Sequence, residues 1–110
     1  MLNFYFPQEC IIIMEAAVMN RDEHQLMEAA RGGSVEAFEK LTGPHQVIIY
    51  NFLLNECQNE FIAGQLTQEV FVRTFRLLTQ KADVGNIYAC IYRTAAEVSS
   101  QAVRESKKIS

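Results

Sequence analysis

The amino-acid sequence predicts an all-α protein, a compact bundle of four to five helices. Apolar residues recur at intervals of three and four over most of the chain, which is the spacing of one helix face. A sustained alternation of apolar and polar residues, which would indicate strands, is not found in the sequence. The length of 110 residues fits one domain, and a content of 49% hydrophobic residues excludes a disordered chain.

Three segments are expected: an N-terminal extension over residues 1–21, a helical domain over residues 22–106 and a tail over residues 107–110. The extension either contains a short helix or precedes the true translation start, for which Met14 and Met19 are alternatives. Its longest apolar run has no preceding cation and is shorter than the roughly 20 residues of a membrane span. A cytoplasmic protein without a membrane partner is therefore predicted.

The first helix of the domain is expected to begin at Asp22, because a carboxylate at this position can cap free backbone amides. Gly32 and Gly33 are expected to end it, since glycine adopts the left-handed conformation without a steric penalty. Ser34 then caps the second helix.

Gly43 and Pro44 predict a kink or a short break in this second helix, because proline lacks a backbone donor. Residues 47–54 are apolar nearly all round, which predicts the central and most buried stretch. A further helix is expected from about Asn59 to Gln80. Its predicted apolar stripe consists of Phe61, Ile62, Leu66, Val70, Phe71, Thr74, Phe75 and Leu78.

A polar loop over residues 81–85 is followed by the last helix, which Asn86 opens. The apolar face of that helix is expected to carry Ile87, Ile91, Ala95, Val98 and Ala102. The predicted core of the whole domain consists of Phe38, Ile49, Phe52, Leu66, Val70, Phe71, Phe75, Ile91 and Ala95.

The sequence contains no motif that indicates an enzyme, and no catalytic residue, metal or cofactor is predicted. A phosphate-binding loop, a dinucleotide-binding glycine pattern and a His-Glu-x-x-His zinc motif are not found in it. Three widely spaced cysteines and two histidines favour reduced thiols over a disulfide framework or a zinc site. The net charge of −3 means that any nucleic-acid contact must use a local patch.

Five local strings nevertheless form a recognisable series. Residues 22–33 read DEHQLMEAARGG, residues 37–41 read AFEKL, residues 50–52 read YNF, residues 66–76 read LTQEVFVRTFR and residues 91–95 read IYRTA. In order and spacing they resemble region 2 of bacterial RNA polymerase sigma factors of the extracytoplasmic-function type. The Gln-Glu-Val-Phe string is the most specific of them. The resemblance covers residues 22–106 and implies a sigma factor region 2-like helical domain.

The resemblance implies two binding surfaces. In the family, the helix with the Gln-Glu pair and the helix before it hold a coiled coil of the polymerase β′ subunit. The matching polymerase-binding residues are Asn51, Asn55, Gln68, Glu69 and Arg73. The family's last helix and the preceding loop bind the melted −10 promoter element through stacking and phosphate contacts. The matching DNA-binding residues are Lys81, Asn86, Tyr88, Tyr92, Arg93 and Arg104.

The chain departs from the family pattern mainly on the DNA side. Cys90 stands where a tryptophan is common, and Ala96-Glu97 replaces an Arg-Asn pair. Losing a cation and adding a carboxylate near phosphates weakens binding to any DNA sequence. Gln101 replaces an aspartate of the family pattern.

Two functional hypotheses follow. The first is a sigma region 2 module that binds core polymerase and contacts the −10 element, with region 4 supplied by a separate polypeptide. The second is a degenerate sigma-like helical interaction module without DNA binding. Region 4 is not found before Ser110, so a truncated chain, a split sigma factor and a degenerate relative stay open, as does an anti-sigma partner.

Overall fold

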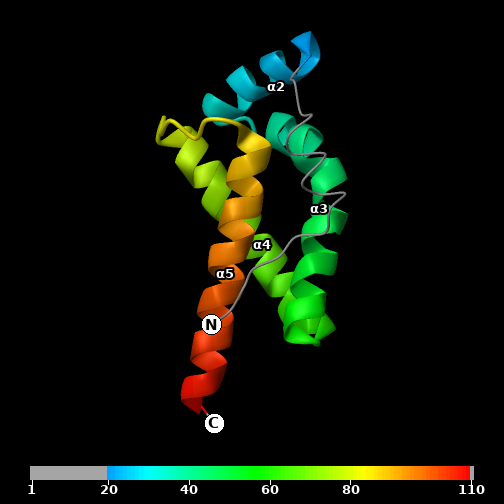
Figure 1. Ribbon diagram of the computed structural model, residues 1–110. Coiled ribbons are helices and arrows are strands. Elements are labelled where there is room, and N and C mark those ends of the chain that lie inside the picture. The colour runs from blue at the N-terminus through cyan, green and yellow to red at the C-terminus, as the bar shows by residue number, and fades with distance from the viewer. Residues whose placement is uncertain (1–19, 110) are drawn as a thin grey trace.

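The computed structural model describes the backbone of residues 20–109 and the side chains of residues 20–105 as a helical bundle (Figure 1). Its helices are α2 (Arg21–Arg31), α3 (Val35–Cys57), α4 (Glu60–Thr79) and α5 (Ile87–Ile109). Residues 20–109 contain no strand, so the all-α prediction is confirmed. The short helix predicted within the N-terminal extension lies outside the described residues.

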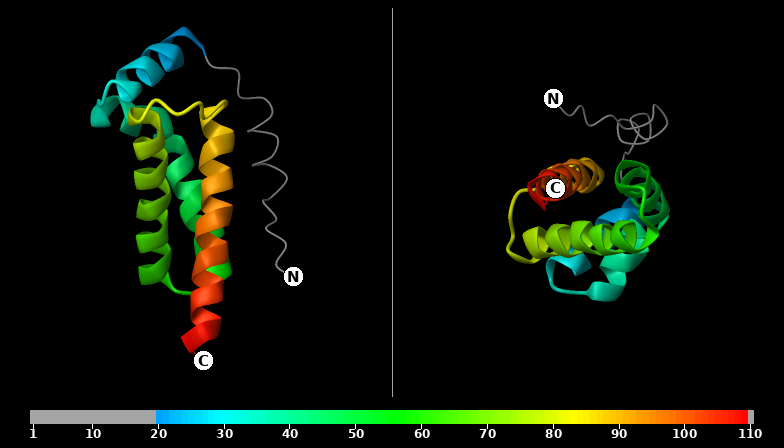
Figure 2. Two further views of the ribbon diagram at one scale, coloured as in Figure 1. Left: turned by 90° about the vertical axis from the view of Figure 1, so that its left-hand side faces the viewer. Right: turned by 90° about the horizontal axis from the view of Figure 1, so that it is seen from below.

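The three long helices alternate in direction, and α2 lies across one end of them (Figures 1 and 2). This end also holds the beginning of α3 and the loop that joins α4 to α5. α4 packs against both α3 and α5, and α2 packs against α3 and α4. α2 begins at Arg21 and α5 continues to Ile109, so both helices reach past the limits drawn for the domain from the sequence.

The ends of the first helices are set by side-chain caps. The Asn20 side chain accepts a hydrogen bond from the Glu23 amide at 2.9 Å, and the Glu23 carboxylate accepts one from the Asn20 amide at 3.5 Å. This reciprocal pair places the N-cap two residues before Asp22, so that prediction is wrong. Gly33 has a φ of 105° after α2, and Ser34 caps α3, as predicted.

α3 is continuous through Pro44, so of the two predicted alternatives, a kink or a short break, the break is wrong. Pro44 itself is exposed, while Leu41, Thr42 and His45 around it are buried. We attribute the continuity to these buried neighbours, whose packing compensates for the one hydrogen bond that proline removes. α3 follows a curved path instead (Figure 1).

The core cluster joins all four helices and agrees with most of the predicted core. Leu66, Phe71 and Phe75 are only half-buried. Phe61 is 74% exposed, so the buried face of α4 does not begin where the predicted apolar stripe begins. Val47 is 65% exposed, so residues 47–54 are not buried on all sides as predicted. The predicted core residues that are buried are Phe38, Ile49, Phe52, Val70, Ile91 and Ala95.

The loop over residues 80–86 leads directly into the cap of α5. The Asn86 side chain accepts hydrogen bonds from the amides of Tyr88 at 2.9 Å and Ala89 at 3.3 Å, which confirms that Asn86 opens this helix. The loop is not wholly polar, because Val84 is only 5% exposed and belongs to the core cluster.

Candidate functional site

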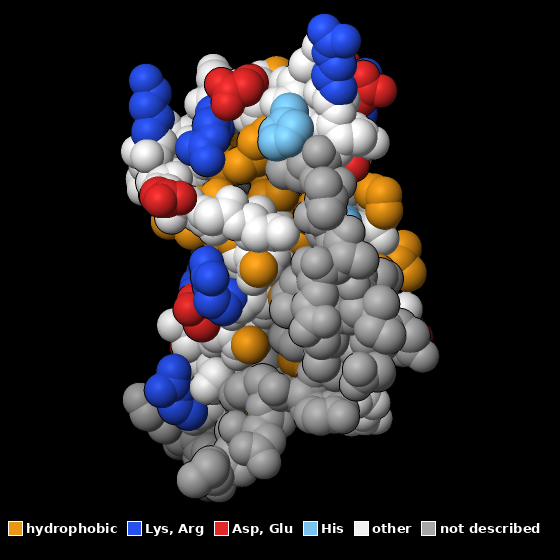
Figure 3. Space-filling view, turned by 45° about the horizontal axis from the view of Figure 1, so that its top comes forward, with side chains coloured by type: hydrophobic (Ala, Val, Ile, Leu, Met, Phe, Trp, Pro, Cys, Tyr) orange, Lys and Arg blue, Asp and Glu red, His pale blue; other side chains and the backbone are white. Residues whose placement is uncertain are grey.

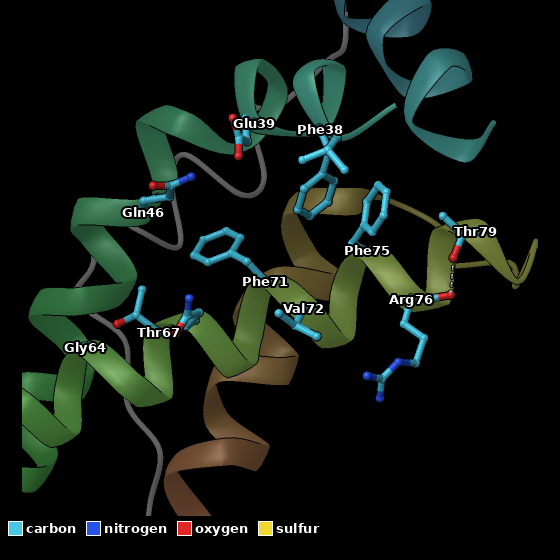
Figure 4. Close-up of a pocket in the computed structure, with 12 residues that line it drawn as sticks. Phe38, Glu39, Gln46, Gly64, Thr67, Phe71, Val72, Phe75, Arg76 and Thr79 are labelled. Carbon is cyan, nitrogen blue, oxygen red and sulfur yellow. Dashed lines mark hydrogen bonds between the residues drawn. The ribbon is translucent and has the colours of Figure 1, made fainter. Parts of the chain in front are cut away.

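An apolar groove of about 910 Å³ runs between the first half of α3 and α4. Figure 4 shows Phe38 from α3 meeting Phe71 and Phe75 from α4 along it. The Phe38 ring makes edge-to-face contacts with Phe75, at 5.0 Å between centroids, and with Phe71, at 6.5 Å. These contacts hold two half-buried rings in the wall of an open groove.

The rim of this groove combines exposed apolar and polar side chains. Val35 is 55% exposed and Val72 is 45% exposed, although both line the groove. Gln68, Glu39 and Arg76 supply an amide and both charges around these apolar residues. An apolar floor with a polar rim is the arrangement found at protein-binding sites that accept an amphipathic helix.

The structure distributes the five predicted polymerase-binding residues over three neighbouring surfaces. Gln68 lines the groove between α3 and α4. Asn51 and Asn55 line a separate hollow of about 440 Å³ near the end of α3. Glu69 and Arg73 face the seam between α4 and α5 instead.

Arg73 joins α4 to α5. Its Nε lies 2.8 Å from the Glu69 carboxylate, and its second guanidinium nitrogen donates to the Gln101 side chain at 2.9 Å. Gln101 is the residue that departs from the acidic family pattern, and here its oxygen accepts this hydrogen bond. Arg73 is therefore engaged within the molecule, which limits what it can offer a partner.

The predicted DNA-binding residues separate into exposed and enclosed groups. Lys81, Arg93 and Arg104 are exposed. Asn86 is occupied as the cap of α5. Tyr88 is 5% exposed and Tyr92 is 1% exposed, so neither ring offers a face to an unstacked base in this conformation.

Tyr88 and Tyr92 belong to a buried polar cluster around His45. The His45 ring stacks on Tyr88, with 4.5 Å between centroids, and its Nδ1 lies 3.2 Å from the Tyr92 hydroxyl. The Tyr88 hydroxyl donates a hydrogen bond to Glu23. The cluster thus ties α2, α3 and α5 together. The four-residue spacing of the two tyrosines signalled a shared helix face, but nothing in the sequence indicated His45 as their partner.

Burial controls the protonation of this cluster. Removal from water lowers the pKa of His45, and the negative charge of Glu23 opposes that effect in part. Burial also raises the pKa of the Tyr88 hydroxyl, and the hydrogen bond to Glu23 adds to the increase. His45 and Tyr88 are both favoured in their neutral forms.

We expect the protein to lose stability as the pH falls below about 6.5, the ordinary pKa of histidine. The unfolded chain then takes up a proton on His45 that the folded protein resists, so acidification favours the unfolded state. Urea unfolding between about pH 5.5 and pH 8 measures this slope. His45→Gln should flatten the slope, whereas His24→Gln, at an exposed position on α2, should preserve it. Equal slopes in the wild type and His45→Gln would contradict the assignment.

Charge on the surface is mixed. On the face shown in Figure 3, Lys and Arg side chains stand apart from one another, several of them beside Asp or Glu. Glu97 is exposed on α5, the helix that also carries Arg93 and Arg104. Such a surface attracts a phosphate backbone less strongly than a continuous cationic patch.

Within residues 20–109, none of the helices is both long and apolar enough to cross a membrane. The same part of the chain has no group of three metal-ligating side chains placed to hold an ion. Comparison with known proteins gave no match to a family model, a curated protein or a solved structure.

Proposed function

We propose that the protein is a sigma factor region 2-like module that binds the β′ coiled coil of core RNA polymerase and takes part in transcription initiation. The observation that carries this proposal is the apolar groove between α3 and α4 with exposed Gln68 on its rim. The resemblance assigns polymerase binding to these same two helices. A groove with apolar walls accommodates one face of a partner helix.

The four residues of the Gln-Glu-Val-Phe string differ in how far they are exposed. Gln68 and Glu69 are exposed, Val70 is fully buried, and Phe71 is half-buried beside Phe38. The string therefore anchors α4 with its apolar half and presents its polar half outward. This division supports a role for the pair in binding rather than in the core.

Replacing Gln68 and Glu69 together by alanine is expected to weaken capture of core polymerase by about 5–10-fold. The change removes hydrogen-bonding groups worth about 0.5–1.5 kcal/mol each at an interface, while alanine preserves the helix. Binding to immobilised core polymerase and to the isolated β′ coiled coil measures the effect, with circular dichroism as the folding control. Unchanged capture of both would contradict the assigned site.

A matched control needs an exposed amide side chain that does not line the groove. Gln58 and Asn59 lie between α3 and α4, but Asn59 caps α4, so its replacement would disturb the fold. Gln80→Ala, at the exposed C-terminal end of α4 and not among the residues that line the groove, is the better control. It should leave polymerase capture unchanged.

DNA contact is the weaker half of the proposal. Exposed Lys81, Arg93 and Arg104 support an interaction of the loop and α5 with the −10 strand. Burial of Tyr88 and Tyr92 instead favours the second candidate, a helical interaction module without DNA binding. The two candidates differ in whether α5 lies against nucleic acid when the protein is bound to polymerase.

If α5 contacts the −10 strand, Glu97→Asn should strengthen binding of a single-stranded −10 oligonucleotide about 2–3-fold in the presence of core polymerase, by removing repulsion of phosphates. The gain should shrink at higher salt, because exposed charges are then screened. Fluorescence anisotropy at two salt concentrations measures it. Glu28→Gln removes the same charge from an exposed position on α2 and is the control. No gain in either salt would favour the module without DNA binding.

A further inference from the structure

Gly64 is a glycine in the second turn of α4, where it is exposed and lines the groove between α3 and α4. A glycine inside a helix is less favourable than alanine, because its backbone loses more conformational freedom on folding. Beyond its two chain neighbours and the backbone of its own helix, no atom lies within 4 Å of where a Cβ atom at Gly64 would stand. Alanine would therefore fit this position without a clash.

The other helical glycine has a local explanation that Gly64 lacks. All five glycines lie in the described part of the chain, and three of them stand in turns or loops. Gly43, within α3, directly precedes Pro44, whose ring clashes with a side chain on the preceding residue in the helical conformation. Gly64 precedes no proline, and its φ is not positive. The contacts within the protein thus give no reason for glycine at this position.

The groove follows one whole face of α4. The residues of α4 that line it recur at the spacing of a single helix face, from Gly64 to Thr79. Figure 4 shows these two residues at opposite ends of the row. At the rise of an α-helix this stretch spans about 22 Å. A face of this length fits a partner helix that lies alongside α4 better than it fits a compact ligand.

The same face contains holes of the kind that receive side chains in coiled-coil packing. A side chain of one helix enters a hole between four residues of the other, which are neighbours at intervals of three and four. The hole nearest the beginning of α4 is formed by Gly64, Thr67, Gln68 and Phe71. It is the most open of them, because Gly64 contributes no side chain. The Thr67 hydroxyl already donates to the Ala63 carbonyl at 2.7 Å, so this hole suits an apolar side chain.

We propose that a large apolar side chain of the polymerase β′ coiled coil enters the hole at Gly64, and that the partner helix comes closest to α4 at this point. The inference rests on the proposed function and adds to it the place of closest contact. Helices approach one another to 8–10 Å between axes, depending on the side chains at the contact, and glycine permits the closest approach. Glycine at this position thus serves the complex and weakens the free protein.

The experiment measures stability and binding of the same variants of the full chain. Gly64→Ala should raise the urea midpoint of unfolding, because alanine favours the helix. It should nevertheless weaken capture by core polymerase and by the isolated β′ coiled coil about 5-fold, and Gly64→Leu should weaken both about 50-fold, since an overfilled contact cannot close. A residue with only a structural role would not raise stability and lower binding together.

Ala29→Leu is the matched control, because Ala29 is exposed on α2 and is not among the residues that line the groove. Its capture should stay within about 2-fold of the wild type. A wild type that polymerase does not capture would remove the proposed function and this inference together. Capture that Val72→Glu abolishes and Gly64→Leu retains would overturn this inference alone.

Two further results would also overturn it. A lower urea midpoint for Gly64→Ala would show that the fold itself requires glycine. Sedimentation of the protein without polymerase examines a second copy as the occupant of the hole. A wild-type dimer that Gly64→Leu dissociates would assign the hole to that second copy, whereas we expect the same sedimentation for both proteins.

Discussion

Leu53→Ala is expected to lower the free energy of unfolding by about 3–5 kcal/mol, the cost of truncating a fully buried leucine whose surroundings cannot collapse. Leu53 has no exposed surface and belongs to the core cluster of the four helices. A domain of this size has about 5–15 kcal/mol of stability in total, so the loss would be a large share of it. Urea denaturation followed by circular dichroism measures the change.

Val47→Ala is the matched control, because it shortens an aliphatic side chain on the same helix. Val47 is 65% exposed, so its truncation should change the free energy of unfolding by less than about 0.5 kcal/mol. Comparable losses for the two variants would show that α3 is rotated about its axis relative to this structure.

Val72→Glu is expected to reduce capture of core polymerase by about 100-fold. Val72 lines the groove and is 45% exposed, so the free protein tolerates a charge there. In the complex the same carboxylate would be removed from water against apolar surface, at a cost of several kcal/mol, and about 1.4 kcal/mol corresponds to a tenfold change in affinity. Binding to immobilised polymerase measures the loss.

Leu77→Glu serves as the control for charge and hydrophobicity. Leu77 is 37% exposed on the same helix but is not among the residues that line the groove. Its replacement should leave capture within about 2-fold of the wild type. An equal loss of polymerase capture in both variants would show that the groove is not the contact surface.

The beginnings of α3, α4 and α5 were predictable because they depend on short-range chemistry. Ser34 caps α3 as predicted, and the helices expected to begin at about Asn59 and at Asn86 are capped by these two residues. Gly33 takes the positive φ that follows α2. A cap needs only a side-chain oxygen and the amides two or three residues away. The wrong prediction at Asp22 has the same local cause. Asn20, two residues earlier, is also a good N-cap, and Glu23 three residues after it completes a capping box.

Burial was less predictable, because it depends on residues far away in the chain. Phe61 continues the apolar spacing of α4, yet its side chain is exposed. Pro44 lies within a continuous helix whose residues on either side are buried, and we attribute the continuity to their packing. The local sequence pattern does not reveal which residues from other helices pack at these two positions.

The candidate site shows the same division between local and distant information. The outward direction of Gln68 followed from the apolar stripe beside it, and its exposure agrees with that expectation. The enclosure of Tyr88 and Tyr92 depends on His45, more than 40 residues earlier, and on Glu23 beyond it. A family resemblance assigns a role to each tyrosine from its position in the sequence. It does not show that the side chains of this protein bury these rings.

Glu23 has a consequence for how the molecule opens. One carboxylate both completes the cap of α2 and accepts the hydrogen bond of Tyr88 on α5, 65 residues later. Fraying of α2 therefore removes a partner from α5, and loosening of α5 weakens the start of α2. The beginnings of α2 and α5 are thereby coupled, so amide protons in both should exchange with solvent through the same opening event.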